Sequence, residues 1–258
     1  MSTDSTIELF GMQIDRVDLA AATERLLDWC GNSPGEACRY VVTPNVDHAV
    51  MFQSHAELRR AYQSAAMIVA DGAPLVWASR LLRRPLPERV AGSDLVPSLL
   101  ALASSRREPL RVFLLGAAPG VAQRAAEQIH YRWKNIAVVG TLSPPLGFEC
   151  DRAENDRIIA AIAEAQPHLL VIGLGAPKQE LWAAQHHRRL AAKVAICAGA
   201  TIDFLAAEKR RSPVWMRGMG LEWIHRLASE PRRLAKRYAR DAWVFPQLVW
   251  REWRGLCG

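Results

Sequence analysis

The sequence predicts an α/β fold in which a largely parallel sheet is flanked by helices. Short runs rich in β-branched residues alternate with longer amphipathic stretches along most of the chain, which is typical of strands joined by crossover helices. No repeat or low-complexity linker interrupts this pattern. A chain of 258 residues is long for one domain but reasonable for an α/β domain.

The individual elements follow from the period of the apolar residues. Short apolar runs are expected as strands at Tyr40–Val42, Met67–Ala70, Val112–Leu115, Ile136–Val139, Leu169–Ile172 and Val194–Cys197. Longer stretches with helical periodicity are Asp18–Trp29, Asp47–Ser64, Pro74–Leu82, Asp94–Ser104, Gly120–Trp133, Glu154–Ala165 and Lys178–Leu190. A further helix is expected to start at Pro231, because proline is well tolerated in a first helical turn.

The composition changes near Glu208. The segment 208–258 holds 12 Lys and Arg residues against 5 acidic ones, which accounts for the whole formal net charge of +7. It also holds five of the nine tryptophans. We therefore expect a Rossmann-type core over residues 1–207 and a basic, Trp-rich helical appendage over 208–258.

The basic side chains of this segment could face solvent, an anionic membrane surface or a nucleic acid. Its apolar residues recur at steps of three, four and seven, at Trp223, Leu227, Leu234, Tyr238, Ala242, Phe245 and Val249, with Arg226, Arg233, Arg237 and Arg240 on an adjacent stripe. A run of charges is usually a solvated helix face, but Arg and Trp beside an apolar stripe favour an anionic membrane surface. A nucleic-acid partner is not expected, because no known binding module is present.

Other bulk features concern location and metals. No apolar run reaches the roughly 18 residues of a spanning helix, and no signal peptide is visible, so we expect a cytoplasmic protein. The five cysteines are odd in number and never spaced as C-x-x-C. We expect reduced thiols, with neither a disulfide framework nor a zinc site.

Polar or glycine-rich segments follow four of the expected strands. They are Thr43-Pro44-Asn45, Asp71-Gly72, Gly173–Glu180 and Ala198–Asp203. Ligands of open parallel sheets bind beyond the carboxyl ends of the strands, so these four segments are expected to converge on one crevice.

Within the crevice, Asp71 is the first candidate for chemistry. A carboxylate directly after an apolar strand is well placed as a general base, although it is equally well placed to cap the next helix. Thr43 and Asn45 are open to the same two interpretations, as polar groups that bind a sugar or as residues that start a helix.

The segment Gly173–Glu180 resembles a phosphate-binding loop, since its glycines permit close approach and Pro177 starts a helix whose amide end attracts anions. It is not a dinucleotide fingerprint, because Lys178 stands where the third glycine would be. No D-x-D sequence is present to hold a metal on a nucleotide-sugar diphosphate. A diphosphate would therefore need organic cations, and the planar fork of arginine suits that task.

Six collinear blocks carry a resemblance to a known family. They are Thr43–Asp47, Ala70–Val76, Glu88–Asp94, Gly175–Glu180, Ala200–Phe204 and Gly220–Leu227, the last followed by Glu230–Arg233 and Arg237-Tyr238. On these blocks the chain resembles the WecG/TagA/CpsF family of bacterial glycosyltransferases, family 26, from about Ile7 to beyond Tyr238. Two departures, Ala73 and Ala207, stand where the family often has glycine.

The resemblance implies a Rossmann-like body and an inverting, metal-independent transfer of a hexose-type sugar. The implied donor is a UDP-sugar and the implied acceptor a polyprenyl-diphosphate-linked saccharide at the cytoplasmic membrane face, with no cofactor. The implied site places Asp71 as general base, Thr43 and Asn45 on hydroxyls, Arg89 and Gln179 at the sugar, Asp203 near the nucleotide, and Arg226, Arg233 and Arg237 over the diphosphate. Gly175, Lys178 and Glu180 complete the set of expected substrate-binding residues.

Two other classes remain open. A nucleotide-dependent oxidoreductase fits the architecture but lacks the fingerprint, and a non-catalytic membrane-binding scaffold explains the appendage but not the polar strand ends. The identity of the sugar (glucose, N-acetylmannosamine or its uronic acid) and of the lipid-linked acceptor is not fixed by any motif, and a homo-oligomer is left open.

Overall fold

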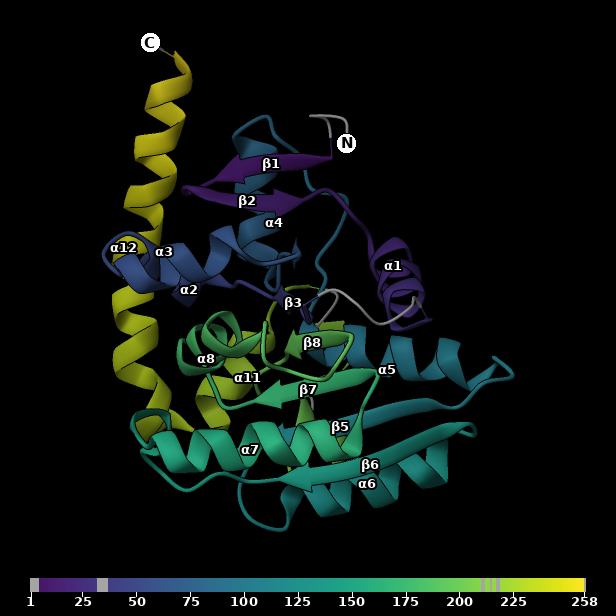
Figure 1. Ribbon diagram of the computed structural model, residues 1–258. Coiled ribbons are helices and arrows are strands. Elements are labelled where there is room, and N and C mark those ends of the chain that lie inside the picture. Colours follow the sequence, from purple (N-terminus) through teal and green to yellow (C-terminus); the bar gives the residue numbers. More distant parts are fainter. Residues whose placement is uncertain (1–4, 32–36, 210–211, 214, 217–218, 258) are drawn as a thin grey trace.

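The computed structural model describes residues 5–31, 37–209, 212–213, 215–216 and 219–257, without the side chains of residues 233 and 257. Its centre is one six-stranded parallel sheet (Figure 1). The strands are β3 (Arg39–Val42), β4 (Met67–Ile68), β5 (Leu110–Gly116), β6 (Ile136–Leu142), β7 (Leu169–Gly173) and β8 (Val194–Cys197), in the order β4-β3-β8-β7-β5-β6. The predicted α/β fold and its six strands are confirmed.

Helices cover both faces of this sheet (Figure 1). One face carries α1 (Leu19–Gly31), α5 (Gly92–Ser104), α6 (Val121–Arg132) and α9 (Thr201–Leu205), and the other carries α2 (Val46–Phe52), α3 (Ala56–Gln63), α4 (Ala73–Leu81), α7 (Arg152–Ala165) and α8 (Lys178–His186), with a short 3-10 turn at Phe148–Cys150. Successive residues of β5 alternate between two buried cores, Val112 and Leu114 in one and Phe113 and Leu115 in the other. This period of two, with both faces apolar, is what a strand covered on both sides requires.

An antiparallel hairpin near the N-terminus was not expected from the sequence. Its strands β1 (Thr6–Leu9) and β2 (Met12–Asp15) are joined by Phe10 and Gly11, both with positive φ. Alternate side chains of the hairpin, including Leu9 and Met12, are fully buried. The hairpin therefore extends one of the two cores beyond the sheet.

The expected helix Asp47–Ser64 is wrong in one respect, because the structure breaks it into α2 and α3. His55 is the N-cap of α3, where its side chain accepts a hydrogen bond from the amide of Leu58. Arg59 donates to the carbonyls of Phe52 and Gln53 at 2.8 and 3.0 Å, which satisfies the end of α2. The break is thus stabilised by side chains, without the glycine or proline that would have marked it in the sequence.

The C-terminal segment forms α11 (Glu222–Ser229) and α12 (Pro231–Cys257), so the expected start at Pro231 is confirmed. Helix α12 runs along one side of the body, past α2 and the hairpin (Figure 1). The rings of Phe10 and Phe245 meet edge to face at 5.2 Å, and Leu234 and Leu248 are buried.

These contacts bury part of the face of α12 that was expected to meet a membrane. The apolar stripe through Leu234 and Phe245 packs against the protein itself, because the same periodicity serves burial in a core and contact with lipid. Other side chains of this helix remain exposed, namely Trp243, Trp250, Trp253 and Leu256. Among the described helices none has both the length and the apolar character needed to cross a bilayer.

Candidate active site

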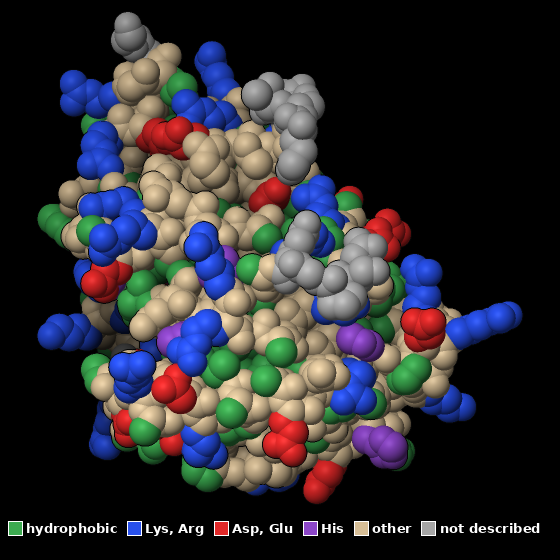
Figure 2. Space-filling view, viewed as in Figure 1, with side chains coloured by type: hydrophobic (Ala, Val, Ile, Leu, Met, Phe, Trp, Pro, Cys, Tyr) green, Lys and Arg blue, Asp and Glu red, His purple; other side chains and the backbone are tan. Residues whose placement is uncertain are grey.

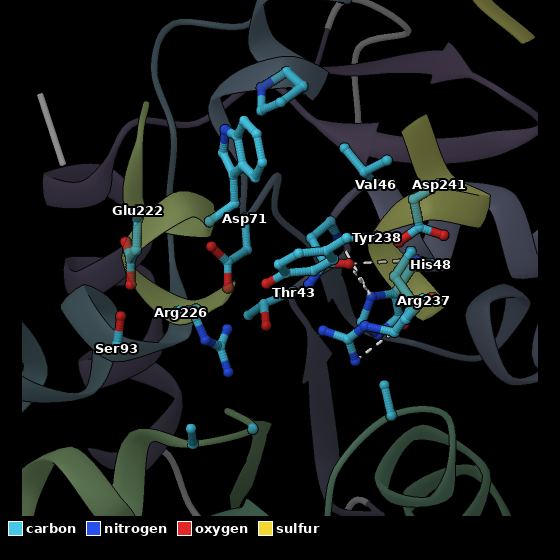
Figure 3. Close-up of a pocket in the computed structure, with 18 of the residues that line it drawn as sticks. Thr43, Val46, His48, Asp71, Ser93, Glu222, Arg226, Arg237, Tyr238 and Asp241 are labelled. Carbon is cyan, nitrogen blue, oxygen red and sulfur yellow. Dashed lines mark hydrogen bonds and ion pairs between the residues drawn. The ribbon is translucent and has the colours of Figure 1, made fainter. Parts of the chain in front are cut away.

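The carboxyl ends of β3, β4, β7 and β8 open into a cleft of about 640 Å³, and α11 and α12 form its opposite wall. All four segments predicted to converge contribute to its lining, through Thr43, Asn45, Asp71, Gly72, Gly173, Gly175, Ala198 and Asp203 among others. In Figure 3, Asp71, Glu222 and Arg226 gather toward one end of the cleft, and His48, Arg237 and Asp241 toward the other. The rule for ligand sites in parallel sheets therefore located the crevice correctly.

Asp71 lies just beyond β4, where its amide donates to the carbonyl of Pro44 at 2.7 Å. Its side chain lines the cleft and keeps 31% of its surface exposed. Burial raises the pKa of this carboxyl from 3.8 to about 6, and Arg89 opposes that rise. The alternative role as a helix cap is not observed, since the N-cap of α4 is Gly72 and no side chain caps it. The carboxylate is thus left to face the cleft.

Thr43 and Asn45 border the cleft while making local bonds. The Thr43 hydroxyl donates to the carbonyl of Cys197 at 3.0 Å, which joins the ends of β3 and β8. Asn45 is the N-cap of α2, with its side chain accepting from the amide of His48 at 3.3 Å. The helix-starting interpretation of Asn45 is therefore correct, and it does not exclude contact with a ligand, because both side chains line the cleft.

A buried hydrogen-bond network ties three of the converging segments together. The Gln179 amide donates to Glu180 Oε1 at 2.8 Å, and the His48 ring contacts the same oxygen through Nε2 at 3.2 Å. Gln179 also accepts from the amide of Gly199 at 3.2 Å. Burial lowers the pKa of His48, but the hydrogen bond and charge of Glu180 outweigh it and the pKa is raised. The network fixes the relative positions of α2, α8 and the loop after β8.

The expected residues of the phosphate-like loop fall in different places. Gly175 and Gln179 line the cleft, whereas Glu180 is fully buried beneath it. Lys178 is not brought to the cleft: its ammonium pairs with Glu149 at 2.8 Å and lies over the ring of Phe148. The loop therefore supplies backbone and Gln179, but not its lysine, to the site.

The C-terminal segment contributes cations to the opposite wall. Arg226 and Arg237 line the cleft, and the Arg237 guanidinium lies over the ring of Tyr238 and 3.4 Å from Asp47. The side chain of Arg233 is outside the part of the chain that the structure describes. Asp203 lines the cleft as expected, with Lys209 3.9 Å away.

Several lining residues had no predicted role, among them Asp47, His48, Trp77, Lys209, Glu222 and Tyr238. Asp47, Glu222 and Tyr238 stand inside the sequence blocks that carry the family resemblance, and Tyr238 was also part of the expected apolar stripe. Within the described ranges, no group of three or more His, Cys, Asp and Glu side chains is placed to hold a metal ion.

Comparison with known proteins agrees with a transferase site. The family model described as the glycosyl transferase WecG/TagA/CpsF family matches residues 7–256. The N-acetylglucosaminyldiphosphoundecaprenol N-acetyl-beta-D-mannosaminyltransferases of Staphylococcus aureus strains MRSA252 and MW2 are each 27% identical over 241 residues, which is 91% of this chain and 89% of theirs.

Parallel α/β sheets bind their ligands at the carboxyl ends of the strands, where this cleft lies, and the family match identifies the enzyme as a glycosyltransferase. The chain belongs to the WecG/TagA/CpsF family. This membership decides against the oxidoreductase and the non-catalytic scaffold.

Proposed function

We propose that this glycosyltransferase moves a hexose-type sugar from a UDP-sugar to a polyprenyl-diphosphate-linked saccharide, with inversion and without a metal ion. The proposal includes a catalytic core over residues 1–207 and an appendage over 208–258 that binds the cytoplasmic face of the membrane. The observation that carries it is the carboxyl of Asp71, with a pKa of about 6, at a cleft whose other wall holds Arg226 and Arg237.

In the proposed reaction Asp71 takes the proton of the acceptor hydroxyl. The hydroxyl oxygen attacks the anomeric carbon as the bond from that carbon to the diphosphate oxygen breaks, and the bonding electrons leave with UDP. A base is needed because neutral hydroxyls are weak nucleophiles, and a pKa near 6 lets Asp71 be ionised at neutral pH while remaining basic enough to accept a proton. A single displacement of this kind inverts the anomeric configuration.

The leaving diphosphate is assigned to the cationic wall. Guanidinium groups bind phosphate oxygens in pairs, and cations aimed at developing negative charge lower the barrier. Arg226, Arg237 and Lys209 all line the cleft and fit this role, and Arg233 is included from the sequence resemblance. These cations take the place that a metal ion would otherwise occupy.

The remaining lining residues are assigned to the two sugars and the nucleotide. Thr43 and Asn45 are proposed to bind hydroxyls, Arg89 and Gln179 to contact the transferred sugar, Gly175 to allow close approach of the ligand, and Asp203 to lie near the nucleotide. Glu180 is proposed to act from beneath, through Gln179 and His48.

Membrane contact is proposed at the mouth of the cleft. Trp77 and Trp223 line the cleft and are nevertheless 52% and 45% exposed. Leu81, Trp215, Met219 and Ile224 add further exposed apolar side chains on α4, α11 and the segment between the core and α11. Tryptophan favours the headgroup layer, and basic side chains, which recur along the α12 side in Figure 2, favour anionic lipid. A lipid-linked acceptor would then reach the cleft without leaving the bilayer.

Release of UDP tests the proposal. Purified enzyme is mixed with UDP-glucose, UDP-N-acetylmannosamine or its uronic acid, and with N-acetylglucosamine carried on a short polyprenyl diphosphate. The name of the Staphylococcus aureus relatives supports UDP-N-acetylmannosamine as the first donor to try. We expect UDP and an extended lipid-linked product only when donor and acceptor are both present. Lack of product with all three donors would refute the proposed substrates but not the family.

A further inference from the structure

One guanidinium near the proposed base is shared among three carboxylates. Arg89 donates to Asp94 Oδ2 at 2.7 Å, and its other terminal nitrogen lies 3.4 Å from Glu222 Oε2 and 3.8 Å from Asp71 Oδ1. All four side chains are largely enclosed, with 19–31% of their surface exposed. Asp71 therefore has the longest contact with the cation that they share.

The backbone places Arg89 next to Asp71. The amide of Val90 donates to the carbonyl of Ala70 at 2.8 Å, which sets Arg89 beside the end of β4. A tight Arg–carboxylate pair has donor–acceptor distances of about 2.7–2.9 Å and occupies an oxygen that a base must offer. The competing carboxylates of Asp94 and Glu222 draw Arg89 to themselves instead.

Glu222 reaches this place from the far end of the chain. It is the first residue of α11, and Gly220 just before it has φ +71°. A Cβ at position 220 would lie 2.5 Å from the Cβ of Ala73 and 2.9 Å from the ring of Trp77, so only glycine lets the chain press this closely against α4. Helix α4 begins two residues after Asp71, so this close approach sets Glu222 beside the base and its arginine.

We propose that Glu222 is a positioning residue that, together with Asp94, holds Arg89 away from Asp71, so that docking of the C-terminal segment leaves the Asp71 carboxylate free to accept a proton. The inference rests on the proposed role of Asp71 as the base. On this proposal the C-terminal segment contributes to catalysis through the carboxylate of Glu222 as well as through its arginines.

The charges around Asp71 agree with this assignment. Charged or titratable groups face it from the segment between α4 and α5 (Arg89), from α5 (Asp94), from α11 (Glu222 and Arg226) and from α2 (His48). Burial is the main cause of the raised pKa of Asp71, Arg89 and Arg226 lower it, and Glu222 and Asp94 raise it. Removing the charge of Glu222 takes away one raising influence and lets Arg89 move toward Asp71, so both effects lower the pKa.

The test is a direct titration of Asp71 in the full-length protein. Aspartate carboxyl carbons are labelled with ¹³C, and the Asp71 signal is assigned by its absence in Asp71→Asn. We expect it to titrate near pH 6 in the wild type, and about one pH unit lower or more in Glu222→Gln. Glu222→Asp, which keeps the charge on a shorter side chain, is expected to titrate between the two. Glu208→Gln is the matched control, because Glu208 is in the same segment but pairs with Arg124 outside the cleft.

Turnover of the same variants distinguishes the positioning role of Glu222 from the proposed role of Asp71 as the base. In Glu222→Gln we expect the acid limb of the pH profile to move down with the titration and kcat to fall several-fold, because a weaker base transfers protons less well. An unmoved or raised titration in folded Glu222→Gln would overturn the positioning role, whatever the turnover. A lowered titration together with normal turnover of Asp71→Asn would leave the positioning intact and refute Asp71 as the base.

Discussion

The guanidinium of Arg237 on α12 lies 3.4 Å from the carboxylate of Asp47, a buried residue in the first turn of α2. Arg240 pairs with the other oxygen of the same carboxylate. Two cations of the C-terminal helix are thus anchored on an acid of the core, next to the proposed substrate cleft. Arg237 also lines that cleft, so one side chain both fastens the helix and is available to a phosphate.

Replacing Asp71 by Asn should abolish most of the activity. The change preserves size and removes the proton-accepting group, so we expect kcat to fall by about two orders of magnitude or more, as is typical for loss of a general base. Initial rates of UDP release measure this, with circular dichroism as the check on folding. Turnover within a few-fold of wild type would place the base elsewhere, with Asp94 and Asp203 the next residues to test.

The same substitution should stabilise the protein at high pH. The pKa of Asp71 is about 6 in the fold and 3.8 in the unfolded chain, so its favourable contribution is full below pH 3.8 and is lost as pH rises through 6. Asn carries no such charge. We expect Asp71→Asn to melt at a higher temperature than wild type at pH 8, and the gap to close toward pH 4. An equal difference in melting temperature at pH 8 and at pH 4 would contradict the raised pKa of Asp71.

Turnover of the wild type should depend on pH through the same group. The base must be ionised, so kcat/KM is expected to rise about tenfold per unit below pH 6 and to level off above it. The measurement is a rate profile from pH 4.5 to 8 at fixed ionic strength. A profile that is flat across this range would show that Asp71 does not titrate in the rate-determining step.

Chelation should leave the activity unchanged. The proposal assigns the charge of the leaving diphosphate to Arg226, Arg237 and Lys209, which line the cleft. Rates after extensive treatment with EDTA should match untreated enzyme, with and without added Mg²⁺ or Mn²⁺. Loss of activity that either ion restores would show that a metal performs this task.

Arg226 should matter for chemistry more than for folding. Neutralising it as Arg226→Gln is expected to lower kcat roughly 100-fold on a short, water-soluble acceptor, as is usual when one charge-stabilising donor is lost. Arg251→Gln is the control, since Arg251 donates to the side chain of Gln53 at the end of α2 and does not line the cleft. Equal rates for the two variants would remove Arg226 from the diphosphate site.

Leu81 should contribute to membrane binding without affecting chemistry. It is 59% exposed on α4, and transferring one such side chain into lipid contributes about 1.5–3 kcal/mol, so Leu81→Ser should weaken co-sedimentation with anionic liposomes about tenfold or more. Leu146→Ser is the control, because Leu146 is 99% exposed but lies between β6 and the 3-10 turn, apart from the exposed apolar side chains of α4 and α11. Similar losses in both variants would argue against a membrane face at the mouth of the cleft.

The strands of the sheet could be predicted from the sequence because parallel strands that are buried on both faces consist of short runs of apolar residues. The strand Val194–Cys197 was predicted with its exact bounds. The polar segments after four of the predicted strands all line the cleft. The prediction missed the N-terminal hairpin, whose strands alternate buried and exposed residues and so contain no continuous apolar run, and the break between α2 and α3, which is made by His55 and Arg59 instead of glycine or proline.

Placement of the site residues was harder to predict than their presence. Lys178 and Gln179 are consecutive residues at the start of α8, yet the helix directs the first toward Glu149 and the second into the cleft. Likewise the apolar stripe of α12 gave no indication whether it would meet lipid or protein. Periodicity reports that a face is buried, and only the tertiary fold says against what.

The packing of α12 on the N-terminal hairpin has a consequence for synthesis of the chain. The edge-to-face contact of Phe10 with Phe245 and the bond from the Phe10 amide to Glu252 join segments that leave the ribosome far apart in time, because 242 positions separate Phe10 from Glu252. Until α12 emerges, the nascent core lacks its partner for the hairpin and part of the wall of its cleft. The enzyme should therefore become competent only after α12 has emerged and docked, and a stalled chain that lacks α12 should present apolar hairpin surface to chaperones.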